Sequence, residues 1–149
     1  MSAVASLLNR LRRPKDDDRE VTKTDAEWAA QLSSQQYHVL RRHGTEAPFS
    51  GAAVRPDADG MYRCGGCGST LFRADTKFES GTGWPSFGDA EHEHVELRRD
   101  FSMGIPRTEV RCRRCGGHLG HVFKDGPRPT GRRYCINASA LAPSDGAAP

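Results

Sequence analysis

The chain has 149 residues, of which 36% are hydrophobic, so it can form one compact domain with a modest core. Residues 1–24 hold six of the 22 Lys and Arg and four of the 19 Asp and Glu, which leaves the rest of the chain nearly neutral. This balance argues against a nucleic-acid-binding protein. No apolar run is long enough to cross a membrane and no secretory signal is recognisable, so we expect no membrane association and a cytoplasmic location.

Residues 1–23 are typical of a flexible leader. They begin with an acid-free, Arg-containing stretch and contain the charge run Lys15–Glu20. An organellar transit peptide is the alternative interpretation of this stretch. We therefore expect a leader at 1–23, one catalytic domain at 24–143 and a disordered tail at 144–149.

Two short helices are predicted at the start of the domain. Thr24 precedes Glu27 by three residues, which is the pattern of a capping box. Ser33 and Gln36 repeat this pattern, and Gly44 is expected to end the second helix. The pair should cover one side of the core with four side chains, Trp28, Leu32, Tyr37 and Leu40.

From residue 61 onward, short β-rich runs alternate with Gly, Pro, Asp and Ser. The runs are MYRC, TLF, TKF, VELRR, TEVRC, GHVF and RRYCI. Their length and spacing predict a domain that consists mostly of antiparallel sheet.

Four of the five cysteines form two C-x-x-C pairs, and a glycine follows each pair. This is the spacing of zinc knuckles, in which two thiolates lie on a tight turn. Two disulfides or a redox pair are the competing interpretations. The lack of a secretory signal disfavours the first, and the presence of two copies disfavours the second. We expect one structural Zn²⁺ held by Cys64, Cys67, Cys112 and Cys115.

The fifth cysteine, Cys135, is the one thiol left for chemistry if zinc takes the others. Thiol catalysis needs an acid or base beside the sulfur, and His118 and His121 follow the second cysteine pair. Asn137 shares a strand face with Cys135 because it lies two residues further along the chain. The residues alone leave open a buried Cys135 without catalytic role. A histidine that ligates zinc in place of a cysteine is disfavoured, because the C-x₂-C-x₂-H-x₂-H spacing is too cramped for one site and the other cysteine pair would lack a partner.

Five segments carry a resemblance to a known family: HGTEAPFSG, YRCGGCGSTLF, DTKFESGTGWPSF, RTEVRCRRCGGHLGHVFKDGPRPTG and RYCIN. Over about residues 25–141 the chain resembles the methionine-R-sulfoxide reductases of the MsrB type. The resemblance implies a mainly β fold with two antiparallel sheets in a tent-like (Mss4-like) arrangement, short N-terminal helices and a Cys₄ zinc site away from the catalytic pocket. It also implies an enzyme that repairs oxidised proteins by reducing the R epimer of methionine sulfoxide.

The family's functional residues transfer to this chain through those motifs. Cys135 would be the nucleophile and would become a sulfenic acid, while His121, supported by His118, would supply a proton to the sulfoxide oxygen. The remaining pocket residues implied by the resemblance are Asn137, Trp84 against the substrate methyl group, and Asp125 nearby.

This sequence departs from many family members at Thr82, where they carry a resolving cysteine. The sulfenic acid would then need an external reductant, either thioredoxin or glutathione with glutaredoxin. We expect no organic cofactor and a monomer. The rival functions are a zinc-ribbon module that binds nucleic acid or protein, and a degenerate family member that only binds methionine sulfoxide.

Overall fold

The computed structural model describes residues 19–49 and 54–143. Most of the predicted leader and the predicted tail lie outside these ranges, so the domain boundaries stay a prediction. Arg19, at the end of the predicted leader, is buried, and its guanidinium donates to the Glu96 carboxylate at 2.7 Å. Contacts with the domain therefore begin before the predicted boundary at residue 24. No helix among the described residues is both long and apolar enough to cross a membrane.

Two short helices come first, α2 (Asp25–Gln31) and α3 (Ser34–Arg42), and both predicted capping boxes are present. Of the side chains expected to face the core, Trp28, Leu32 and Leu40 are buried and Tyr37 is half-buried. The second helix ends before Gly44, as predicted, but the left-handed residue at its end is His43 and not the glycine. His43 takes the left-handed conformation at the helix end, with φ 56°, and Gly44 N–H then donates to the His38 carbonyl.

The rest of the domain is mainly β, with two antiparallel sheets, as predicted. A two-stranded sheet pairs β1 (Met61–Arg63) with β2 (Thr70–Arg73). The larger sheet has the order β3-β4-β8-β7-β6-β5. Its strands are β3 (Lys77–Phe78), β4 (Ser86–Phe87), β5 (Val95–Asp100), β6 (Arg107–Cys112), β7 (His118–Phe123) and β8 (Arg133–Ile136). The described residues also form two 3₁₀ turns, η2 (Ala74–Thr76) and η3 (Ala138–Ala140).

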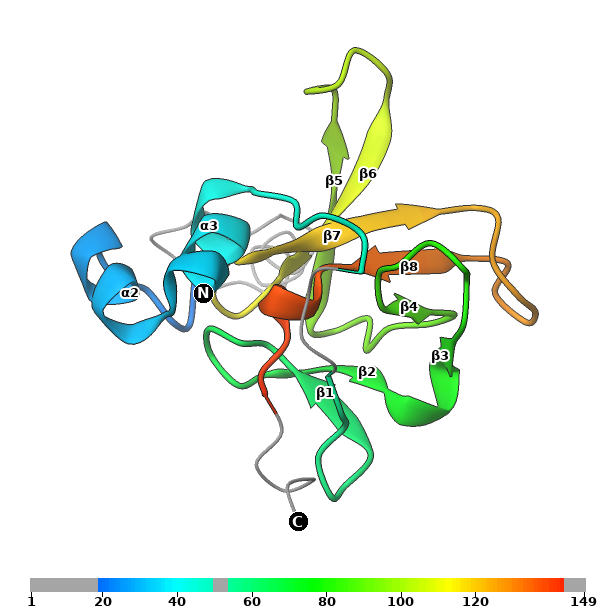
Figure 1. The fold of residues 1–149 in the computed structure, drawn as a ribbon, viewed down its shortest axis with the longest axis horizontal. Helices are drawn as coiled ribbons and strands as arrows, with labels where there is room; N and C mark the ends of the chain where they lie inside the picture. Colours follow the sequence, from blue (N-terminus) through cyan, green and yellow to red (C-terminus); the bar gives the residue numbers. More distant parts are fainter. Residues whose placement is uncertain (1–18, 50–53, 144–149) are drawn as a thin grey trace, which may run out of the picture.

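The core lies where the two sheets and the helices meet (Figure 1). Phe72 of β2 stacks on Phe87 of β4, with ring centroids 4.4 Å apart, and Tyr62 meets Phe87 edge-on. Helix α3 packs on β7 and η3. The β5–β6 hairpin projects beyond the rest of the molecule (Figure 1). This arrangement holds β7 and β8 rigidly in the middle of the larger sheet, where the chemistry-bearing residues lie.

Candidate active site

A cavity of about 250 Å³ opens beside the centre of the larger sheet. Four of the sequence-predicted site residues line it: Trp84, His121, Cys135 and Asn137. The other lining residues are Thr45, Thr82, Arg107, Gly120, Phe123 and Arg133. One pocket therefore brings together a thiol, an imidazole, an indole and two guanidinium groups from separate parts of the chain.

Cys135 and His121 are directly opposite each other on neighbouring strands, because β7 and β8 pair in that register. Directly opposed residues of an antiparallel pair place their side chains on the same face, about 5 Å apart at Cβ. The adjacent Gly120 allows this approach, since a Cβ there would lie 2.1 Å from the Cys135 carbonyl oxygen. The strand register alone thus sets the imidazole beside the thiol.

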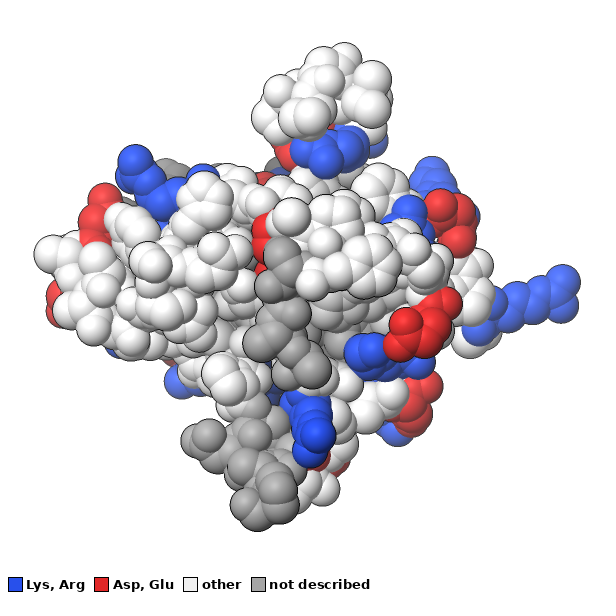
Figure 2. Space-filling model, in the orientation of Figure 1, with Lys and Arg blue, Asp and Glu red and all other residues white. Residues whose placement is uncertain are grey.

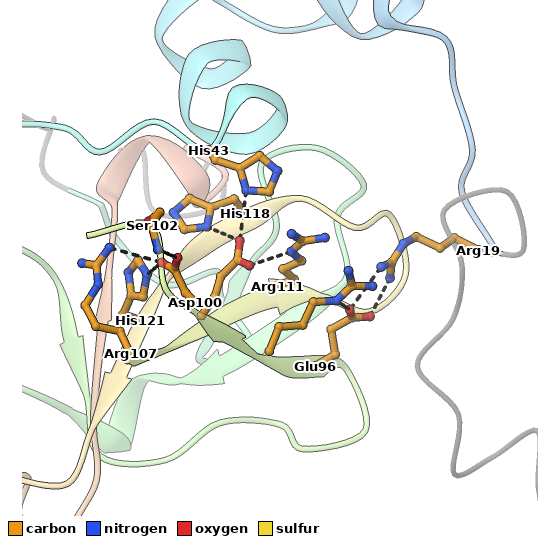
Figure 3. Close-up of polar contacts among 11 residues, drawn as sticks. Arg19, His43, Glu96, Asp100, Ser102, Arg107, Arg111, His118 and His121 are labelled. Atoms are coloured by element: carbon orange, nitrogen blue, oxygen red, sulfur yellow. Dashed lines mark hydrogen bonds and ion pairs between the residues drawn. The ribbon is translucent and has the colours of Figure 1, made fainter. Parts of the chain in front are cut away.

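A carboxylate holds His121 in place from the β5–β6 hairpin (Figure 3). Nε2 of His121 donates to Oδ2 of Asp100 at 2.7 Å, and Arg107 donates to the same oxygen at 3.2 Å. The Ser102 amide donates to the other oxygen of Asp100. Burial lowers the pKa of His121, Asp100 opposes that effect, and the charges of Arg107 and His118 add to it. The hydrogen bond from His121 in turn holds the pKa of Asp100 well below its usual range.

His118, which lies next to His43 in Figure 3, is held in a similar way by Glu109 of β6. Its Nδ1 donates to Oε2 of Glu109 at 2.6 Å, and Nδ1 of His43 lies 3.2 Å from the same oxygen. Burial pushes the pKa of Glu109 up, but the hydrogen bonds from His118 and His43 and the charge of Arg111 outweigh it, so this pKa is well below its usual range. His118 does not line the cavity, yet its ring packs edge-on against that of His121, with centroids 5.5 Å apart.

Trp84 and Asn137 are fixed by the same buried residue, Glu46. The Glu46 carbonyl accepts from Nε1 of Trp84, and its amide donates to Oδ1 of Asn137, both at 3.0 Å. The Glu46 carboxylate accepts from the amides of Ala138 and Ser139 at the start of η3. Because each of these groups is paired, the cavity wall is ordered before any substrate binds.

Asp125 does not line the cavity and is exposed, with 65% of its side chain accessible. It contacts the site through Arg133, which it holds by two hydrogen bonds of 2.9 and 3.2 Å. Burial raises the pKa of Cys135, and the charge of Arg133 opposes this while that of Asp125 adds to it. The structure thus places Asp125 outside the cavity wall and in contact with Arg133, so its effect on the thiol is indirect, and its proximity to the substrate stays a prediction.

The other four cysteines come together as one cluster, and their Sγ atoms lie within 4.8 Å of one another. Sγ of Cys64 is 3.7 Å from that of Cys115, and Sγ of Cys67 is 3.5 Å from that of Cys112. A tetrahedral site with zinc–sulfur distances of about 2.3 Å separates its sulfurs by about 3.8 Å, so the cluster fits Zn²⁺. Neither histidine of the candidate site joins it, which removes the alternative of a mixed Cys and His site.

Sequence reasoning missed the charged residues that orient the predicted ones: Glu46, Asp100, Arg107, Glu109 and Arg133. Glu46, Glu109, Arg107 and Arg133 lie in or next to the segments that carried the resemblance, so the signal was their position in those segments. Asp100 lies outside them, and only the strand order shows that it faces His121.

Comparison of the sequence with known proteins identifies relatives of the whole chain. Residues 32–144 match the model of the SelR domain family. The chain is 55% identical to the peptide methionine sulfoxide reductase MsrB of Methanosarcina barkeri over 83% of this chain and 87% of that protein. It is 53% identical to the protein of the same name from Agrobacterium fabrum over 82% of this chain and 91% of that one. It is 54% identical to the protein of that name from Bradyrhizobium diazoefficiens, over 85% of this chain and 92% of that one.

Proposed function

Since the chain belongs to the SelR-domain family of MsrB-type peptide methionine sulfoxide reductases, we propose that it reduces the R epimer of methionine sulfoxide in oxidised proteins. The observation that carries this proposal is the cavity in which Cys135, His121, Trp84 and Asn137 meet. A thiol that shares one cavity with an imidazole and an indole matches the three needs of the reaction, which are a nucleophile, an acid and a binding face for the S-methyl group.

The Cys135 thiolate attacks the sulfoxide sulfur, while protons pass to the sulfoxide oxygen. Oxygen is a poor leaving group unless it is protonated, and the imidazolium of His121 on the neighbouring strand is the acid. The attack forms an S–S bond, and the doubly protonated sulfoxide oxygen leaves as water. Water then adds to Sγ of Cys135 with loss of a proton, which breaks the S–S bond and yields methionine and a Cys135 sulfenic acid, so the substrate gains the two electrons that the thiol loses. The ring of Trp84 packs against the polarised methyl group.

Asp100 and Glu109 act on this step through the histidines. Asp100 accepts a hydrogen bond from His121, which fixes the ring and favours its protonated form, and Glu109 fixes the ring of His118 by accepting its hydrogen bond. Arg133 has the matching effect on the nucleophile, because its positive charge opposes the burial that raises the pKa of Cys135.

Regeneration of Cys135 requires thiols from outside the chain. Thr82 lines the cavity at the position where many relatives carry the resolving cysteine, and the other four thiols form the metal cluster. Two external thiol equivalents reduce the sulfenic acid to the thiol with release of water and a disulfide. Thioredoxin, or glutathione with glutaredoxin, is the proposed donor. A monomeric state and a cytoplasmic location stay predictions from the sequence.

The proposed metal is one structural Zn²⁺ on Cys64, Cys67, Cys112 and Cys115. When bound, it would link the turn after β1 to the turn after β6 and would leave no ligand position open for substrate. Its contribution would be to folding, and the reduction would proceed on the residues of the separate cavity.

The test is reduction of the separated R and S epimers of N-acetyl-methionine sulfoxide methylamide, with dithiothreitol as reductant. Wild type should reduce the R epimer alone, and Cys135→Ser should reduce neither. An active Cys135→Ser variant would refute the nucleophile. Inactivity of a folded, zinc-loaded wild type on both epimers would refute the reaction.

A further inference from the structure

The β5–β6 hairpin ends in an exposed apolar tip, formed by Phe101, Met103 and Ile105. These side chains are 62%, 69% and 62% exposed. Together with Phe49 they make up the exposed large hydrophobic side chains of the described residues. Figure 2 shows the tip as an uncharged cap that stands above charged groups at its base. An apolar cluster that projects into solvent indicates an interaction surface, because single exposed hydrophobic residues are common but clusters are not.

This hairpin tip is continuous with the catalytic cavity. Asp100 directly precedes it and accepts the hydrogen bond from His121, while Arg107 directly follows Pro106 and lines the cavity. An extended chain advances about 3.3 Å per residue. The residues of a polypeptide that would meet the hairpin tip are therefore neighbours of the sulfoxide in the sequence, while the sulfoxide itself occupies the cavity.

Phe49 lies beside another part of the cavity wall. Its amide donates to the carbonyl of Gly83 at 2.8 Å, and the two neighbours of that glycine, Thr82 and Trp84, both line the cavity. Phe49 is 81% exposed. All four exposed large hydrophobic residues of the described chain are thus attached to segments that form the cavity.

The cations at the base of the hairpin tip are already engaged. Arg107 pairs with Asp100, Arg98 pairs with Glu96, and the guanidinium of Arg99 lies over the Phe101 ring, 5.8 Å from its centroid. The hairpin tip can therefore bind a partner through apolar contacts rather than through its charges.

We infer that the hairpin tip is a docking surface for a polypeptide segment that carries apolar residues next to an oxidised methionine. The inference rests on the proposed function and deepens it by defining the substrate class. Methionine is a core residue, and its oxidation makes it polar and disrupts the surrounding core. The chain around an oxidised methionine consequently exposes apolar neighbours, which is the chemistry that Phe101, Met103 and Ile105 can bind.

The experiment compares three R-sulfoxide substrates: the blocked single residue, a peptide with Leu and Phe around the sulfoxide, and a peptide with Ser and Asn there. The variant Phe101→Ser, Met103→Gln, Ile105→Ser makes the hairpin tip polar. The matched control Phe101→Leu, Met103→Leu, Ile105→Val keeps it apolar. Because all three side chains are exposed, both variants should retain the fold, which circular dichroism checks.

We expect the polar variant to raise KM for the Leu and Phe peptide about five- to tenfold, since a loss of about 1.4 kcal/mol is tenfold in affinity. Its kcat should be unchanged, and its kinetics on the blocked residue should match wild type. The apolar control should behave as wild type on all three substrates.

An unchanged KM for the Leu and Phe peptide would overturn the inference. An equal loss on the blocked residue would also overturn it, because the hairpin tip would then act through Asp100 and His121. Sedimentation at the assay concentration detects a second copy of the chain as occupant, and a dimer abolished by the polar variant without a change in KM would contradict docking of substrate. Failure of wild type to reduce any of the three R-sulfoxides refutes the proposed function, and the inference falls with it.

Discussion

Nε2 of His121 donates a 2.7 Å hydrogen bond to Oδ2 of Asp100, so the imidazole opposite Cys135 has a carboxylate partner of its own. Burial and the neighbouring charges of Arg107 and His118 lower the pKa of His121 below its ordinary value of 6.5. Asp100 works against that decrease. The acid strength of the proposed proton donor therefore depends on a residue from a different hairpin.

Two opposite pKa shifts determine how the activity should vary with pH. The reactive form needs a Cys135 thiolate, whose pKa is raised above 9.0, and a protonated His121, whose pKa is lowered below 6.5. Between these values the reactive fraction is constant with pH and equals ten to the power of the pKa of His121 minus the pKa of Cys135, which is a small fraction because the first pKa is the lower one. The low-pH decrease in kcat/KM then reports the pKa of His121, and the high-pH decrease reports that of Cys135.

Replacement of Asp100 by Asn should lower the pKa of His121 further, because the carboxylate that stabilises the imidazolium is lost. Each unit of decrease lowers the plateau of kcat/KM about tenfold and moves the pH at which the low-pH decrease begins one unit lower. The pH profile, together with titration of the His121 ring by NMR, measures both effects.

Asp75→Asn is the matched control, since Asp75 is an exposed carboxylate paired with Arg73 outside the cavity. It should leave both the profile and the His121 titration unchanged. An Asp100→Asn enzyme with the wild-type His121 pKa would contradict the role assigned to Asp100.

The Arg133–Asp125 pair predicts opposite effects on the nucleophile. Arg133→Met should raise the pKa of Cys135, because a positive charge that favours the thiolate is removed. Asp125→Asn should lower the same pKa, because a repulsive negative charge is removed. The rate of iodoacetamide alkylation against pH measures this pKa, and Cys135→Ser gives the background of the zinc-cluster thiols. Shifts of the same sign in both variants would refute this electrostatic account.

The sequence was most informative where function depends on local spacing. Capping boxes fixed the starts of α2 and α3, and two C-x-x-C turns indicated the metal cluster. Strand β4 was missed because two residues, Ser86 and Phe87, are too few to show periodicity.

The partners of the two histidines were missed for a different reason. Asp100 and His121 lie 21 residues apart, and they meet only because β6 lies between β5 and β7 in the sheet. Glu46 is 91 residues from Asn137. Alternation of polar and apolar residues predicts which face of a strand a side chain occupies, but contacts of this kind also require the strand order and the register.

Removal of the metal should unfold the domain rather than only inactivate it. The described ligands join the ends of β1 and β6, and three of the four thiols are buried. Buried thiolates without a cation would repel each other, and zinc binding to such sites contributes of the order of 10 kcal/mol to folding. We expect about one zinc per chain in wild type and in Cys135→Ser, and loss of both the zinc and the thermal transition in Cys112→Ser. A stable, cooperatively folded Cys112→Ser protein without zinc would contradict a structural metal.

Thr82 and Cys135 line the same cavity, so a thiol at position 82 should capture the sulfenic acid that the wild type must pass to an external reductant. After one turnover without reductant, Thr82→Cys should form an intramolecular disulfide with loss of water, whereas wild type should retain a sulfenic acid that dimedone traps. Thr45→Cys is the matched control, since Thr45 also lines the cavity but lies in a different segment of the chain, before β1. A disulfide that forms in Thr82→Cys and not in Thr45→Cys assigns the resolving role to position 82, whereas equal disulfide formation in both variants would contradict a role specific to that position.

Mass spectrometry of the alkylated proteins distinguishes these products. A disulfide between Cys135 and a zinc-cluster cysteine in wild type would instead show that the chain already contains its own resolving thiol, and the requirement for an external reductant of the sulfenic acid would be wrong.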